Sequence, residues 1–258
     1  MRHLFSLTSF RYLPLLFLLL LSAKSNSVEL KAAVASNFVF TFNEIAAEFQ
    51  KQYDHSIKVS SGSSGKLYSQ IRSGAPFDLF FSADEDKPER LIENGLALKD
   101  TQFVYAKGAL VLWSTTLDDN LENKLRNKEF KSLAIANPKI APYGLASQEV
   151  LNALNIENEG SHPWVLGENI SQTFQFVYSG AAELGFVSLS HLYQLNKNSS
   201  QKYGNVWLVP SNLYSPINQS AVILKHSQDQ EAAKLFFSFF KKDAVKKMLQ
   251  KHGYNKRL

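Results

Sequence analysis

The hydrophobic residues of this chain fall into short apolar runs that alternate with segments of helical spacing. Residues 28–35 form the first apolar run, and apolar side chains at helical spacing follow from Phe38 to Phe49. The alternation then repeats, with strands predicted at 55–60 and 77–82 and helices predicted after Ser64 and around 88–94. Strands that alternate with helices are typical of an α/β fold with parallel neighbouring strands.

A long apolar segment at residues 103–114, interrupted by Gly108, predicts a strand that leaves one lobe and enters another. After it, the alternation of strands and helices begins again. Strands are predicted at 132–137, 185–189, 206–209 and 221–224, and helices after Pro142, near Ile170 and at 229–251. We expect the last helical segment to close over the first lobe.

The first 27 residues have the three-part pattern of a secretory signal peptide. Arg2 and Arg11 precede an apolar run at 13–21, and small residues follow it. The run is short for a membrane span, and an uncleaved anchor is the alternative. The chain has no cysteine, so neither a lipid-modified cysteine nor a disulfide framework is available. We therefore expect a soluble exported protein in the periplasm.

Removing this segment lowers the net charge of the chain. The formal charge of +5 includes Arg2, Arg11 and Lys24, so the mature chain carries 5 − 3 = +2. The remaining lysines near the C-terminus alternate with apolar residues, as on the solvated face of a helix. A nearly neutral chain without a long basic run does not indicate a nucleic-acid-binding protein.

Serine residues stand at the starts of two predicted helices. Ser36 follows the first strand, and the small residues 60–64 follow the second. The first N–H groups of a helix lack partners within the helix and lie at the positive end of its dipole, so they bind anions together with nearby hydroxyls. In parallel sheets, ligands bind beyond the carboxyl ends of the strands. The pattern predicts an anion site, although a serine-rich loop that only caps a helix has the same composition.

Several segments, in order along the chain, resemble the substrate-binding proteins of molybdate ABC importers. They are VASNF, SSGSSGKLYSQI, GAPFDLFFSAD, NPKIAPYGLASQEVL, GENISQTFQFV, LGFVSLS and SPINQSAVIL. The resemblance implies a two-lobed periplasmic binding protein fold, with a mainly parallel sheet flanked by helices in each lobe and a two-crossing hinge. It implies a signal peptide at 1–27, a first lobe at 28–105 and 215–258, and a second lobe at 106–214.

The resemblance also implies a set of ligand-binding residues. The binding hydroxyls of the family match Ser36 and Ser64, and the backbone donors of its second lobe match Tyr143 and Ile170. A fifth position, which is a tyrosine in some members, matches Ser188 here. Because serine is shorter than tyrosine, either water or another group fills the space, and the candidates are Tyr143, Tyr214 and Gln219.

A donor-only site suits molybdate, which stays a dianion at neutral pH and offers only acceptor oxygens. Each hydrogen bond to a charged group is worth roughly 1.5–3 kcal/mol, so about six to eight of them give submicromolar affinity after the costs of association. The implied set contains no cation; Lys66 and Lys139 lie near it in sequence and are read as solvated neighbours. We expect tungstate to bind as well, with no cofactor and no protein ligand to the metal itself.

Enzymatic functions have little support in the sequence. The six histidines share no motif and are predicted on loops and edges, as surface residues. No spacing typical of a metal site occurs, and the glycines around Ser63 do not fit the phosphate-loop pattern. The alternatives that remain are a binding protein for another ligand, such as sulfate, phosphate, ferric ion or an organic acid, and a non-transport adhesin or structural factor. The expected partners are the oxyanion and a membrane permease, and we expect a monomer.

Overall fold

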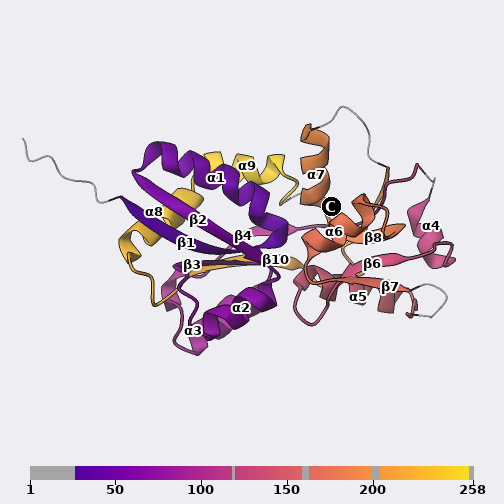
Figure 1. The fold of residues 1–258 in the computed structure, drawn as a ribbon, viewed down its shortest axis with the longest axis horizontal. Coiled ribbons are helices and arrows are strands. Elements are labelled where there is room, and N and C mark those ends of the chain that lie inside the picture. Colours follow the sequence, from indigo (N-terminus) through magenta and orange to yellow (C-terminus); the bar gives the residue numbers. More distant parts are fainter. Residues whose placement is uncertain (1–26, 118–119, 159–162, 199–203, 256–258) are drawn as a thin grey trace, which may run out of the picture.

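The computed structural model describes residues 27–117, 120–158, 163–198 and 204–255. The described chain forms two five-stranded sheets, each covered by helices on both faces (Figure 1). The strand order is β2-β1-β3-β10-β4 in the first sheet and β7-β6-β8-β5-β9 in the second. The predicted two-lobed α/β fold is therefore confirmed.

In the first lobe, β1 runs parallel to β2 and β3, whereas β10 lies antiparallel between β3 and β4. The second lobe repeats this arrangement, because β6 runs parallel to β7 and β8, and β5 lies antiparallel between β8 and β9. The antiparallel strands are those next to the crossings between the lobes. The strands of the first sheet are β1 (Val28–Ala35), β2 (His55–Gly62), β3 (Leu79–Ser82), β4 (Phe103–Gly108) and β10 (Ile217–Ile223). Those of the second are β5 (Leu110–Ser114), β6 (Leu133–Ala136), β7 (Trp164–Gly167), β8 (Leu184–Ser188) and β9 (Asn205–Leu208).

The chain crosses between the two sheets twice. It leaves the first sheet at the end of β4 and enters the second at the start of β5, with Ala109 between them. It returns between β9 and β10. The predicted lobe boundary after residue 105 falls within β4, which continues in the first sheet to Gly108. A Cβ at Gly108 would lie 2.1 Å from the Tyr143 hydroxyl of the second lobe, so this crossing has no room for a side chain.

Helices cover each sheet on both faces. In the first lobe, α1, α8 and α9 cover one face and α2 and α3 the other; in the second lobe, α5 lies on the face opposite α6 and α7 (Figure 1). The first-lobe helices are α1 (Val39–Gln52), α2 (Ser64–Arg72), α3 (Asp86–Glu93), α8 (Gln230–Phe240) and α9 (Asp243–Lys251). The second-lobe helices are α4 (Leu121–Arg126), α5 (Pro142–Ala153), α6 (Ile170–Tyr178) and α7 (Leu189–Asn198). Short 3-10 turns occur at Ser36–Phe38 (η1) and Lys99–Thr101 (η2).

The alternation of β1 divides the first-lobe core between the two faces of its sheet. Leu30 and Val34 point toward an aromatic core that includes Phe42 and Phe81, whose ring centroids lie 4.9 Å apart. Ala33 points to the opposite face, where it packs with residues of α2 and α3. Because β1 is buried on both faces, its carboxyl end is held rigidly, and this end leads directly into the turn at Ser36.

Most predicted elements are present, with shifted ends. The strand predicted at 77–82 begins at Leu79, and the predicted helix at 229–251 is two helices separated at 241–242. The helices α4 and α7 and the strand β7 were not predicted. The predicted signal peptide lies outside the described residues, apart from Ser27. None of the helices in the described part of the chain is both long enough and apolar enough to cross a membrane.

Candidate anion-binding site

Three helices from the two lobes begin at the same small cavity. They are α2 of the first lobe and α5 and α6 of the second. The cavity measures about 10 Å³, which is about the space that one water molecule needs. Its lining residues are Ala35, Ser36, Asn37, Gly62, Ser63, Ser64, Ala83, Ala141, Pro142, Tyr143 and Ile170.

The capping of α6 leaves one N–H group of its first turn without a partner. The Asn169 side chain accepts hydrogen bonds from the N–H groups of Ser171 and Gln172, both at 3.0 Å, and the Asn169 carbonyl accepts from Thr173. Among the described residues, the Ile170 N–H has no acceptor, and Ile170 lines the cavity. The sequence analysis identified Ile170 but missed Asn169, whose residue type before a helix is an N-cap signal.

The other two helices follow the same rule. In α2, the Lys66 N–H bonds to the Ser63 hydroxyl at 3.4 Å and the Gly65 N–H to the Ile140 carbonyl at 2.8 Å. Within the described chain this leaves the Ser64 N–H without an acceptor. In α5, the residues that follow Tyr143 donate to the Ala141 carbonyl, and Pro142 has no N–H. The Tyr143 N–H likewise has no acceptor among the described residues, so each helix offers one free N–H at the cavity.

Two serine hydroxyls add to these backbone donors. The Ser64 hydroxyl oxygen accepts from the Ala83 N–H at 2.9 Å, which leaves its own proton available for a ligand. The Ser36 hydroxyl has no hydrogen-bond partner among the described residues, although Ser36 is only 5% exposed. The cavity therefore collects three N–H donors and two hydroxyl donors around a space for one group.

The lining of the cavity carries no charged side chain. Its one titratable group is Tyr143, and burial raises the pKa of that phenol well above its ordinary value, so Tyr143 stays neutral. The remaining electrostatic contribution comes from three helix N-termini, where the dipole and the free N–H groups favour negative charge. A small anion that offers only acceptors fits this set.

Four of the five sequence-predicted site residues line this cavity, and Ser188 does not. Ser36, Ser64, Tyr143 and Ile170 are among the lining residues. The Ser188 hydroxyl lies 2.9 Å from the Ser190 hydroxyl and 2.6 Å from the Nδ1 atom of His191. Its role in ligand binding stays a prediction, and its immediate partners are protein groups.

The groups considered as substitutes for a tyrosine at position 188 have partners of their own. The Tyr214 hydroxyl accepts from the Leu110 N–H at 3.2 Å. The Gln219 side-chain oxygen accepts from Asn37 at 2.9 Å, and its amide nitrogen donates to the Tyr143 hydroxyl at 3.3 Å. Gln219 therefore ties Asn37 of the first lobe to Tyr143 of the second, and both of these residues line the cavity.

Hydrogen bonds join the two lobes around the cavity. Besides the bond from Gly65 to Ile140, the Ser171 hydroxyl donates to the Ser36 carbonyl at 3.1 Å. At the surface, the Lys66 ammonium lies 2.7 Å from the Glu168 carboxylate, and both side chains are about half exposed. Lys66, which was predicted to be a solvated neighbour of the site, thus pairs across the lobes. Glu168 lies outside the cavity lining.

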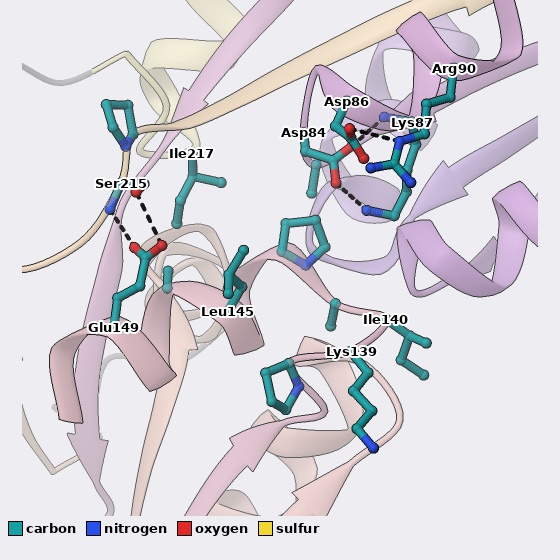
Figure 2. A pocket seen from close by; sticks show the side chains of 16 residues that line it. Asp84, Asp86, Lys87, Arg90, Lys139, Ile140, Leu145, Glu149, Ser215 and Ile217 are labelled. Carbon is teal, nitrogen blue, oxygen red and sulfur yellow. Dashed lines mark hydrogen bonds and ion pairs between the residues drawn. The ribbon is translucent and has the colours of Figure 1, made fainter. Parts of the chain in front are cut away.

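A larger cavity of about 270 Å³ adjoins the small one and shares Ala83, Ala141 and Pro142 with it. It lies between the lobes, with Asp84, Asp86, Lys87 and Arg90 on one side and Lys139 and Glu149 on the other (Figure 2). Lys87 pairs with Asp84, Arg90 pairs with Asp86 at 2.8 Å, and Glu149 accepts from Ser215. Because these charges are largely satisfied within the protein, the small cavity is the better candidate for an anion.

Two histidines differ from the sequence prediction. His191 and His252 are 2% and 4% exposed, whereas both were predicted at the surface, so this prediction was wrong. His191 lies in α7 and contacts Ser171 of α6, and His252 follows the end of α9 and contacts Glu44 of α1. These contacts with residues far away in the sequence cannot be read from the local pattern. Among the described residues, no group of three or more histidines and carboxylates is placed to hold a metal ion.

The chain matches the family model described as "Bacterial extracellular solute-binding protein" over residues 30–255. It is 40% identical to the molybdate-binding protein ModA of Azotobacter vinelandii over 237 residues, which cover 91% of this chain and 93% of that protein. It is 38% identical to the molybdate-binding protein ModA of Rhodobacter capsulatus, with 88% of each chain covered.

The solved structure of the periplasmic molybdate-binding protein of Azotobacter vinelandii has the same fold. It superposes with a TM-score of 0.82 at 39% identity, covering 89% of this chain and all of that one. With 89% of this chain covered, the match spans both lobes. This chain therefore belongs to the bacterial extracellular solute-binding proteins.

Proposed function

We propose that this protein captures molybdate, and tungstate in the same way, between its two lobes and delivers it to the membrane permease of an ABC importer. The proposal places the protein in the periplasm after removal of residues 1–27. Its role is binding for transport and not catalysis. The anion makes hydrogen bonds to the protein through its oxygens, and no protein atom coordinates the molybdenum.

The observation that carries this proposal is the convergence of donors on one small cavity. The free N–H groups of Ser64, Tyr143 and Ile170 and the hydroxyls of Ser36 and Ser64 all belong to residues that line it. A tetrahedral oxyanion has four acceptor oxygens, so five donors from two lobes surround it without a cation. The similarity to two molybdate-binding proteins at 38–40% identity names molybdate as the first ligand to test.

Adding molybdate to the purified mature protein should stabilise it and change its fluorescence. A ligand at a hundred times its dissociation constant contributes about 2.7 kcal/mol, which raises the melting temperature of a protein of this size by roughly 5–10 °C. Trp113 and Trp164, in β5 and β7 of the second lobe, report the change in emission. If millimolar molybdate alters neither signal, the proposed ligand is wrong.

Replacing either serine hydroxyl of the cavity should weaken molybdate binding by about 1–3 kcal/mol, since each substitution removes one charge-assisted donor. In the Ser64→Ala variant, the Ala83 N–H also loses its acceptor, so we expect a larger effect there than in Ser36→Ala. Titration calorimetry measures both dissociation constants.

The control is Ser73→Ala, an exposed serine at the opposite end of α2, which should bind like the parent. Circular dichroism shows whether each variant remains folded. Parental affinity in both Ser36→Ala and Ser64→Ala would place the anion elsewhere.

A further inference from the structure

A buried glutamine lies where the first-lobe strands at the two crossings come together, next to the anion cavity. Gln219 of β10 is 0% exposed. Gly108 ends β4, and a Cβ there would lie 2.7 Å from the side-chain nitrogen of Gln219 and 2.1 Å from the Tyr143 hydroxyl. A side chain at position 108 would therefore displace the Gln219 amide from Tyr143.

An irregularity in the pairing of β10 with β4 places a tyrosine beside this amide. Gln219 pairs with Ala106, whereas the next residue of β10 pairs two positions away on β4. Tyr105, between the two, is an extra residue on β4. Bulges of this kind re-aim side chains and are over-represented next to functional sites. Here Tyr105 and Ala106, although adjacent, both face the aromatic core, and the Tyr105 hydroxyl lies 3.0 Å from the Gln219 side-chain oxygen.

The two ends of the Gln219 amide hold residues of opposite lobes. Its oxygen accepts from the Asn37 side chain at 2.9 Å, and its nitrogen donates to the Tyr143 hydroxyl at 3.3 Å. Asn37 and Tyr143 both line the cavity. Asn37 follows directly after Ser36, whose hydroxyl is a donor of the cavity, and the Tyr143 N–H is a donor itself. One planar amide therefore links a donor-bearing segment of each lobe.

The groups that contact the amide are an amide and two phenols, and all three are uncharged. Burial raises the pKa of the Tyr105 and Tyr143 phenols well above their ordinary values, so both stay neutral. These contacts therefore add no charge that would attract an anion. What they fix is the distance between the segments that carry the donors.

We propose that Gln219 is a positioning residue that sets the selectivity of the cavity, because its amide fixes how far apart the donors of the two lobes stand. The inference rests on the proposed function, since it concerns the same anion. If every donor pairs with an oxygen of bound molybdate, donors held at that spacing are left unpaired around a smaller anion. Donors that are no longer held can shift toward the smaller anion, so the advantage of molybdate falls.

Other hydrogen bonds between the lobes restrain other parts of the cavity. The Gly65 N–H donates to the second lobe from the start of α2, and the Ser171 hydroxyl donates to the first lobe from the start of α6. Neither bond reaches Tyr143 at the start of α5. Removing the Gln219 contacts therefore frees the α5 side of the cavity while the lobes stay joined elsewhere.

Two substitutions break this bridge from its two ends. Gln219→Met keeps the length of the side chain without its hydrogen bonds, and Tyr143→Phe removes the hydroxyl but keeps the N–H donor of α5. Each should weaken molybdate binding roughly tenfold, as expected for about one buried hydrogen bond, and change sulfate binding less than about threefold. The ratio of molybdate to sulfate affinity therefore falls in both variants.

The double variant shows whether the two residues act together. Because both substitutions break the same contact, the double variant should lose no more molybdate affinity than the more affected single variant. Independent structural damage would instead multiply the two losses to roughly a hundredfold. The matched control is Asn218→Ala, which removes a hydrogen bond to Glu85 within the first lobe and outside the cavity lining, and it should keep the parental ratio.

Titration calorimetry with molybdate, and displacement of molybdate by sulfate, give the ratios for the full mature protein. Circular dichroism shows whether each variant is folded, and if Gln219→Met does not fold, the ratio in Tyr143→Phe decides. The parental ratio in a folded variant, multiplied losses in the double variant, or an equal fall in Asn218→Ala overturns the inference, and the proposed function stands as long as the parent binds molybdate. A parent that binds sulfate as tightly as molybdate overturns the inference too. If the parent binds neither anion, the proposed function fails with it.

Discussion

Sulfate and phosphate should bind this protein at least a hundredfold more weakly than molybdate, and tungstate should bind about as well as molybdate. The donors of the cavity come from the starts of three helices and from the turn at Ser36, so their spacing is rigid. Molybdate and tungstate have nearly the same size, whereas sulfate is smaller. If every donor pairs with an oxygen of bound molybdate, the smaller sulfate leaves some donors unpaired, at about 1–3 kcal/mol for each buried group without a partner.

Phosphate fails for a different reason. Hydrogen phosphate carries a proton and needs an acceptor, and the lining of the cavity contains no carboxylate. The acid nearest in sequence to the Ile170 donor, Glu168, is paired with Lys66 at the surface. A protonated oxygen would therefore face the N–H and hydroxyl donors of the cavity, which is unfavourable.

Competition calorimetry decides the selectivity. Molybdate is titrated into protein saturated in turn with tungstate, sulfate and phosphate, and the apparent dissociation constants give the ratios. Sulfate that displaces molybdate at equal concentration would contradict the expectation. In that case the cavity is less selective, and the protein is a general oxyanion binder.

Replacing Gly65 by valine should weaken molybdate binding by about 2–4 kcal/mol and leave the protein folded. A Cβ at position 65 would lie 2.8 Å from the Ile140 carbonyl oxygen and 2.9 Å from its Cα, which are backbone atoms of the other lobe. The lobes must separate to admit the side chain, and the hydrogen bond from the Gly65 N–H to Ile140 is lost. Overpacking costs about 1–3 kcal/mol and a lost hydrogen bond about 0.5–1.5 kcal/mol.

The fold itself should tolerate this change because Gly65 lies inside α2, where any other residue type except proline is a better helix former than glycine. The unfolding free energy, measured in denaturant without ligand, should stay within about 1 kcal/mol of the parent. Gln70→Ala, an exposed change on the same helix, should alter neither quantity. A valine variant with parental affinity would show that the bound protein does not make the contact between Gly65 and Ile140.

The local pattern of the chain was enough to predict two of the cavity residues. Ser36 and Ser64 follow predicted strands and precede predicted helices, and the resemblance added Tyr143 and Ile170 at two further helix starts. Strand ends and helix starts are local features, set by apolar periodicity and by capping residues. The segment interrupted by Gly108 likewise predicted the passage from one sheet to the other.

Tertiary structure decided the features that depend on residues far apart in the sequence. The antiparallel position of β10 between β3 and β4 depends on the return of the chain from the second lobe. The burial of His191 and the partners of Ser188 depend on the packing of α7. A lone histidine in a polar segment has no periodic signal that marks it as buried, because its neighbours in space come from other elements. The sequence by itself thus determined which residues could donate to an anion, and only the packing of the two lobes decided which of these donors meet in one cavity.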